Sequence, residues 1–120
     1  MTVFAAILKR AVEATPNAIG GAFADRDGEM VDSFATIDAQ EWAILTAHYG
    51  IVLAQLDAAF GTWHFGGPEY FVAQHQAMEV VVHAVEAGYY ALLAMRGGGP
   101  LGIAIESLRA AASELREEMK

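Results

Sequence analysis

Apolar residues near the N-terminus recur with the spacing of a helix. The positions on this face are Phe4, Ile7, Leu8, Ala11 and Val12. Their i, i+3, i+4 pattern predicts an amphipathic helix with one face turned toward a core. Pro16 ends the predicted helix, because proline disfavours helical geometry in the residue before it.

From Asn17 onward the pattern changes to that of two short strands. Residues 18–35 predict a hairpin that turns around Arg26–Glu29, where Asp27-Gly28 supplies the positive φ that a tight turn requires. Small side chains dominate one face of the first strand, at Ala18, Gly20, Ala22 and Ala24. We therefore expect another element to pack very close to this strand.

The next segment predicts a long helix with a well-marked start. Asp38 can cap it, and Glu41 three residues later completes a capping-box pattern. The helical pattern continues to about Phe60, which is roughly six turns.

This helix has no clean polar face. One broad apolar stripe consists of Trp42, Leu45, Tyr49, Val52, Leu53, Leu56 and Phe60, and we expect it to face the sheet. A second stripe consists of the small residues Ala43, Ala47, Gly50, Ala54, Ala58 and Gly61. A helix that is apolar on most sides is expected to be buried on most sides. The small-residue stripe is therefore expected to meet another helix at a subunit interface.

The second half of the chain predicts three strands and a final helix. Glu69–Gln76, Met78–Glu86 and Tyr89–Met95 are strand-like, and the last two are nearly continuous apolar runs, which favours a sheet covered on both faces. Pro100 opens the final helix. The order α-β-β-α-β-β-β-α predicts one α/β (α+β) sandwich over residues 1–120. Its five-stranded antiparallel sheet carries the two terminal helices on one face and the long central helix on the other.

Composition limits the partners. Of the 120 residues, 55% are apolar, and the formal net charge is -8. A chain this acidic lacks the basic surface that binds nucleic acid or anionic lipid, so we expect neither partner. Cysteine is absent, and Lys9 and Arg10 interrupt the apolar N-terminal run, unlike a signal peptide. We expect a cytoplasmic protein.

No residue pattern predicts an active site. The four histidines, His48, His64, His75 and His83, lack the spacing of metal ligands. In a hairpin that turns at Gln76-Ala77, His75 and His83 should point to opposite faces. No Lys-Ser/Thr pair follows Gly97–Gly99, as a phosphate-binding P-loop requires. We expect no catalytic residues, no metal and no cofactor.

Three long segments carry a resemblance to a known family. They are ILKRAVEATPNAIGGAFADRDGEMVDS (7–33), YFVAQHQAMEVVVHAVEAGYYALLAM (70–95) and PLGIAIESLRAAASELREEM (100–119). Together with the long middle helix, they resemble the roadblock, or dynein light chain, family, including its bacterial polarity-switch members. The resemblance covers essentially the whole chain and rests on pattern and segment order.

The resemblance implies a homodimer in which the third strand pairs with its twin and the middle helices pack side by side. Mapped onto this chain, the interface consists of Ala43, Ala47, Gly50, Ala54, Ala58, Glu69, Phe71, Ala73 and His75. It also implies a non-enzymatic scaffold or regulator of a small Ras-like GTPase. The middle helix holds no arginine, so an arginine finger from there is not expected. The alternatives are a small-molecule sensor of profilin-like architecture and a structural subunit of a larger complex.

Overall fold

A computed structural model describes all 120 residues, and its element order is the one that the sequence predicts. The elements are α1 (Val3–Ala14), β1 (Ala18–Ala24), β2 (Met30–Ala35), α2 (Ala39–Phe60), β3 (Tyr70–Gln74), β4 (Met78–Glu86), β5 (Tyr89–Arg96) and α3 (Leu101–Glu118). The third strand is shorter than expected. It ends at Gln74 because the chain bends at Gln76-Ala77, and the His75 amide donates to the Met78 carbonyl across that bend.

The five strands form one antiparallel sheet in the order β2-β1-β5-β4-β3. β1 and β5 pair in the interior of the sheet, although 64 residues separate Ala24 from Tyr89. β2 and β3 are the two edges. The predicted antiparallel sheet is confirmed.

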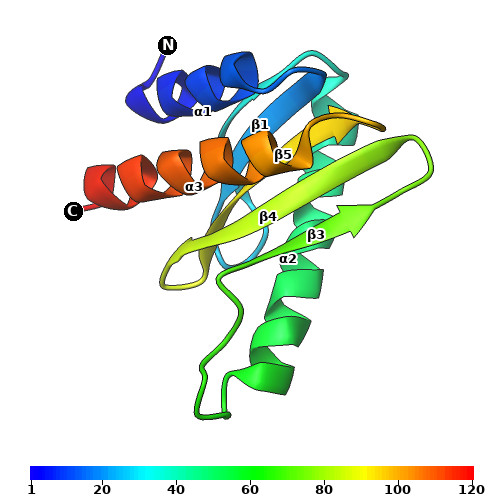
Figure 1. The fold of residues 1–120 in the computed structure, drawn as a ribbon. Helices are drawn as coiled ribbons and strands as arrows, with labels where there is room; N and C mark the ends of the chain where they lie inside the picture. Colours follow the sequence, from blue (N-terminus) through cyan, green and yellow to red (C-terminus); the bar gives the residue numbers. More distant parts are fainter.

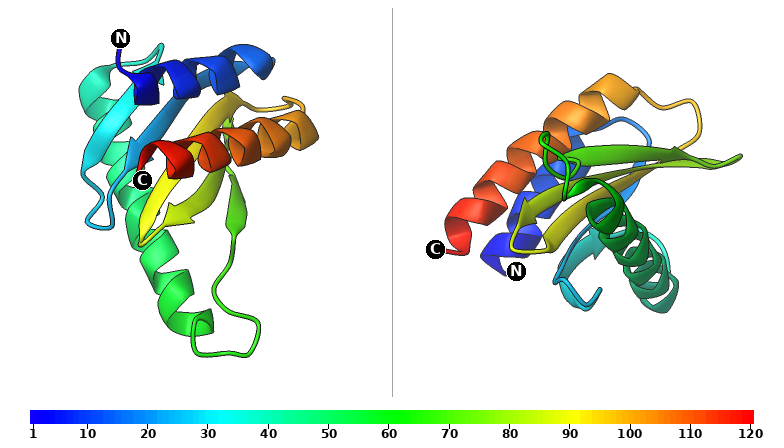
Figure 2. Two further views of the ribbon diagram at one scale, coloured as in Figure 1. Left: turned by 90° about the vertical axis from the view of Figure 1, so that its left-hand side faces the viewer. Right: turned by 90° about the horizontal axis from the view of Figure 1, so that it is seen from below.

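Two layers of helix cover the two faces of the sheet (Figure 1). α1 and α3 lie side by side on one face and share a core with Phe23, Leu93 and other inward residues of the strands. α2 lies on the opposite face, over a second core that includes Ala22 and Leu92. The end-on view in Figure 2 shows the three layers. The predicted placement of the helices is confirmed.

The start of α2 is fixed by its cap and by a close approach to β1. The Asp38 carboxylate accepts a hydrogen bond from the Glu41 amide at 3.0 Å, as the sequence predicts. Trp42, one turn into the helix, is buried over Gly20, where an added Cβ would lie 3.0 Å from the Trp42 ring. The indole nitrogen donates to the Gly21 carbonyl at 3.3 Å. The small residues of β1 therefore make room for this tryptophan.

Only the first two thirds of α2 pack firmly on the sheet. Its buried residues are Trp42, Thr46, Tyr49, Gly50 and Leu53, and none follows Leu53. The last turns of the helix and the loop to β3 extend past the sheet (Figure 1). By length and hydropathy alone α2 could cross a membrane, yet just 17% of its most apolar window is buried within this chain. Most of its apolar surface is therefore uncovered.

Candidate partner-binding surface

A groove of about 910 Å³ runs between α2 and the edge strand β3. Its lining is mostly apolar and consists of Ile37, Glu41, Ile44, Leu45, His48, Tyr49, Val52, Leu56, Phe71, Ala73, His75 and Met78. Glu41 is the one carboxylate among these residues. Ile44 is 51% exposed and Val52 38% exposed, so large aliphatic side chains face solvent here. Exposed apolar surface gathered in this way marks a binding site.

β3 and the residue that follows it, His75, supply one wall of the groove through alternate positions. Phe71, Ala73 and His75 point toward α2, because successive side chains of a strand alternate between faces. The Tyr49 ring lies 6.2 Å from the Phe71 ring, and its hydroxyl is hydrogen-bonded to His75 Nε2. Burial raises the pKa of Tyr49. The three strand residues expected at an interface therefore share one face and border one groove.

The outer edge of β3 lies beside this groove. β3 pairs with β4 alone, in a register that sets Tyr70 opposite His83 and Gln74 opposite Glu79. An edge strand offers unpaired amides and carbonyls to another strand. The edge and the groove therefore form one continuous surface with both hydrogen-bonding and apolar parts.

The alanine stripe of α2 lies on the other side of the helix, away from β3. Ala47, Ala54 and Ala58 border a smaller cavity of about 330 Å³, shared with Arg26 and Asp27 of the β1–β2 turn. Ala43 falls on the same side by its helical spacing. Ala43, Ala54 and Ala58 are exposed, so this side of α2 stays open to a partner, and their place in an interface remains a prediction.

Gly50 needs correction as an interface residue, because it is buried under Tyr90. A Cβ at this position would lie 2.9 Å from Cζ of the Tyr90 ring and closer still to its hydroxyl oxygen. That hydroxyl donates to the Thr46 carbonyl at 2.7 Å. Burial, and to a smaller extent the charge of Asp25, raise the pKa of Tyr90 to about 12. Gly50 therefore serves the contact between α2 and β5 within one chain.

Glu69 lies apart from the other expected strand residues. It borders a pocket with His83 and Arg109, under α3, on the sheet face opposite the groove. Its carbonyl accepts from the Ala84 amide at 2.8 Å, so its backbone still continues the β3–β4 pairing. The strand alternation that brings Phe71 to the groove turns Glu69 away from that position.

Several groove residues of α2 were not expected at an interface. They are Ile44, Leu45, His48, Val52 and Leu56. In the sequence, Leu45, Val52 and Leu56 belong to the apolar stripe that is expected to face the sheet. Ten residues separate Val52 from Trp42, which places their side chains about 80° apart around the helix. A stripe of that width can face a single sheet, so the pattern alone does not show that Trp42 is buried on the sheet while Val52 is 38% exposed beside β3.

The histidines lie at separate places. His75 borders the groove and His83 the pocket under α3, so they face opposite sides of the sheet as the hairpin geometry predicts. His48 Nδ1 lies 2.8 Å from the Ile44 carbonyl on α2. Nowhere do three His, Asp or Glu side chains converge as metal ligands would.

The comparisons with known proteins bear on the fold. No family model and no curated protein matches the sequence. Many solved structures resemble it in fold, three of which follow. The Roadblock/LC7 domain from Streptomyces avermitilis has a TM-score of 0.85 at 10% identity, with 94% of each chain covered. MglB from Myxococcus xanthus has a TM-score of 0.87 at 13% identity, covering 99% of this chain and 96% of MglB.

The third structure is described as MglB with a tetrameric arrangement. Its TM-score is 0.83 at 17% identity, with 93% of this chain and 84% of that chain covered. Identities this low show the fold alone. The chain has a roadblock-like fold, as the resemblance in its sequence predicts.

Proposed function

We propose that this chain is a non-enzymatic, cytoplasmic scaffold that forms a homodimer through β3 and the α2 groove and binds a small Ras-like GTPase. The observation that carries the proposal is the free edge of β3 beside a groove lined by exposed aliphatic side chains. The roadblock-like fold supports it, because the resemblance in the sequence implies this assembly and this class of partner.

A second copy suits the surface physically. Two β3 strands related by a two-fold axis run antiparallel, so each can satisfy the other's free edge. The same axis brings the partner's α2 toward the groove, where aliphatic side chains from both helices would leave water. The tetrameric arrangement of the MglB structure shows that this fold occurs in assemblies.

An aromatic cluster at the end of α2 offers a place for a different partner. Phe60 and Trp63 pack edge to face with their ring centres 5.8 Å apart, and Phe65 is 89% exposed. Large aromatic side chains are enriched at protein interfaces and at binding hot spots. This cluster supports docking of a GTPase on the part of the molecule that extends past the sheet.

The dimer is tested by two matched substitutions. Val52→Glu places a charge in the groove, whereas Ile103→Glu places the same charge on the exposed side of α3, on the opposite face of the sheet. We expect sedimentation velocity to show a dimer for the wild type and for Ile103→Glu, and a monomer for Val52→Glu. A monomeric wild type at tens of micromolar, or the reverse order of the variants, would contradict the proposed interface.

The GTPase is tested by affinity capture from the native cell with the wild-type chain and with Trp63→Ala. Recovery of a Ras-like GTPase that prefers one nucleotide state, and its loss in the variant, would support the proposal. If no GTPase is captured and one compound of a metabolite panel raises the melting temperature of the protein, the result would favour the small-molecule sensor. Recovery of a large stable complex without a GTPase would favour the structural-subunit alternative.

A further inference from the structure

A second pocket lies on the opposite face of the sheet, where α3 crosses the end of β4. Its volume is about 460 Å³. Its lining, in contrast to that of the groove, is largely polar and charged and consists of Pro68, Glu69, His83, Ala84, Val85, Arg109, Ser113 and Arg116. α2 and the groove occupy the other face of the sheet, so the pocket is separate from the α2 part of the proposed dimer contact, although Glu69 adjoins β3.

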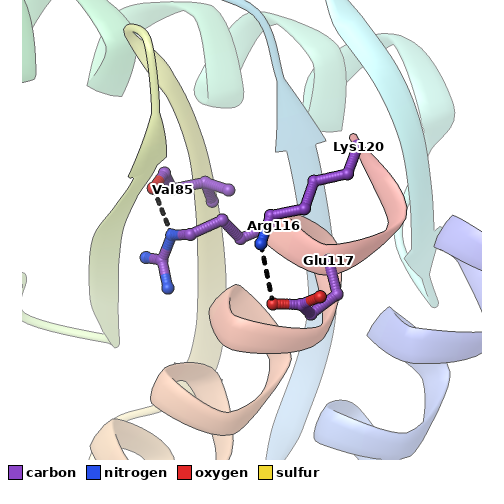
Figure 3. Close-up of polar contacts among 4 residues, drawn as sticks. All are labelled: Val85, Arg116, Glu117 and Lys120. Carbon is purple, nitrogen blue, oxygen red and sulfur yellow. Dashed lines mark hydrogen bonds and ion pairs between the residues drawn. The ribbon is translucent and has the colours of Figure 1, made fainter.

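α3 presents three polar side chains to the pocket. Arg109, Ser113 and Arg116 follow i, i+4, i+7 spacing and so share one face of the helix. Arg116 Nε donates to the Val85 carbonyl at 2.8 Å, as Figure 3 shows, while the neighbouring Glu117 pairs with Lys120. This bond fixes the direction of the Arg116 guanidinium.

The terminal nitrogens of Arg116 are free to bind a ligand. The ion pairs of the chain are Arg10–Glu114, Arg109–Glu106 and Lys120–Glu117, and Arg116 takes part in none of them. Neither of its terminal nitrogens makes a hydrogen bond within the chain. The chain has 15 acidic residues and only 7 basic ones, so carboxylates are plentiful. Arg116 nevertheless bonds to a main-chain carbonyl and not to a carboxylate.

A stack of three side chains forms the adjoining wall. The Arg109 guanidinium lies 5.7 Å from the centre of the Tyr70 ring, and that ring is stacked on His83 with centres 6.0 Å apart. His83 Nδ1 lies 2.7 Å from the Ala84 carbonyl, which can only accept, so Nδ1 carries a proton. The other ring nitrogen, Nε2, has no hydrogen-bond partner in the chain. Every fully buried side-chain nitrogen in the chain has such a partner, so Nε2 must be in contact with solvent.

We propose that this pocket binds the anionic end of a ligand, a phosphate monoester or a carboxylate, between Arg109 and Arg116. The planar guanidinium fork matches two oxygens of either group and forms short, charge-assisted hydrogen bonds with them. The Ser113 hydroxyl lies between the two arginines along the helix and can donate a further bond. Glu69 is the one carboxylate in the lining, so it opposes a second negative group there. Glu106 pairs with Arg109 at 2.8 Å, so the anion shares that guanidinium with Glu106 and has Arg116 to itself.

The site is tested by titrating the ¹⁵N-labelled full chain with phenyl phosphate and with benzoate. We expect saturable shifts of the amides of residues 83–85 and 109–116. Arg116→Gln and Arg109→Gln should each weaken binding about tenfold or more, since each removes charge-assisted hydrogen bonds. Arg10→Gln, which makes the same charge change at an exposed ion pair outside the pocket, should leave the affinity unchanged. Glu69→Gln should tighten binding.

Two results would overturn the site. One is the absence of saturation with both compounds while the spectrum shows a folded chain. The other is equal weakening by Arg10→Gln and the pocket variants, which would indicate attraction to net charge alone. Tighter binding of a phosphoserine peptide than of phenyl phosphate would assign the anion to a partner protein, and equal binding would assign it to a free small molecule.

Discussion

The hydroxyl group of Tyr90 lies directly beneath Gly50, in a gap that holds no Cβ atom. The contact joins β5 in the middle of the sheet to the centre of α2, and the Tyr90 hydroxyl donates to the Thr46 carbonyl one turn away. Few other residues hold α2 on the sheet, and none after Leu53 is buried. This contact therefore sets the position of α2 and, with it, the width of the groove beside β3.

Gly50→Ala should destabilise the fold although alanine favours helices. Helix propensity alone would stabilise the variant by about 1 kcal/mol, but the added methyl group collides with the Tyr90 ring and forces α2 outward. We expect a net loss of about 1–3 kcal/mol, typical of overpacking, measured by urea unfolding. The matched control is Gly102→Ala on α3, where nothing lies within 4 Å of the new atom. Equal stability of the two variants would show that α2 moves freely at this point.

Stability should fall at alkaline pH because of Tyr90. Its pKa is about 12 in the folded chain and about 10 in the unfolded chain, so the neutral hydroxyl favours folding. This contribution is complete below about pH 10 and is lost as the pH rises toward 12. The raised pKa of Tyr49 acts in the same direction.

Urea midpoints measured from pH 8 to pH 11.5 check this expectation. Tyr90→Phe should be less stable at pH 8, because the bond to Thr46 is lost, and its stability should depend less on pH above 10. An identical alkaline slope in the variant and the wild type would assign the effect to other residues.

The sequence predicts the fold because its local signals agree with one another. Asp38 caps α2, as its position before the helix predicts. Gly28 has a φ of 82°, the positive value that the Asp27-Gly28 turn requires. Strand alternation was less reliable. A register irregularity between Ala18 and Gly20 lets Ile19 pack toward α2, although alternation from Phe23 assigns it to the other face. Bulges of this kind depend on the partner strand and leave no mark in a single strand's pattern.

The candidate surface could be predicted only in part. Phe71, Ala73 and His75 share a face by the two-residue period of a strand, and the structure places all three in the groove. The sequence shows that Gly50 and Ala47 are small but not which neighbour packs against them. A second helix, a strand or an aromatic ring can each require a small residue at such a position. Here Tyr90 and the turn at Gly28 account for these two positions from within the chain.

Glu79 should tie the β5–α3 loop to the sheet. Glu79 is 6% exposed, and its carboxylate accepts from the Gly98 amide at 3.1 Å and from Gln74 Nε2 at 3.0 Å. Glu79→Ala should cost about 1–3 kcal/mol and speed hydrogen exchange of the Gly98 amide. Glu86→Ala, an exposed change on the same strand, should stay within about 0.5 kcal/mol of the wild type. If hydrogen exchange of the Gly98 amide is unchanged in the Glu79 variant, the loop is ordered without the bond to Glu79.

The proposed dimer should become tighter as salt is added. Each copy carries a formal net charge of -8, so two copies repel each other, while the groove contributes aliphatic contacts and a single carboxylate, that of Glu41. Raising the ionic strength from about 0.05 M to about 0.5 M shortens the range of that repulsion to a few ångströms and leaves apolar burial intact. Sedimentation equilibrium should therefore give a lower dimer Kd at the higher salt.

Glu41→Gln should reduce the salt dependence, because it removes a like charge at the contact itself. A dimer that weakens as salt is added would instead be held by ion pairs. No lysine or arginine lines the groove, so the interface of such a dimer would lie elsewhere on the molecule.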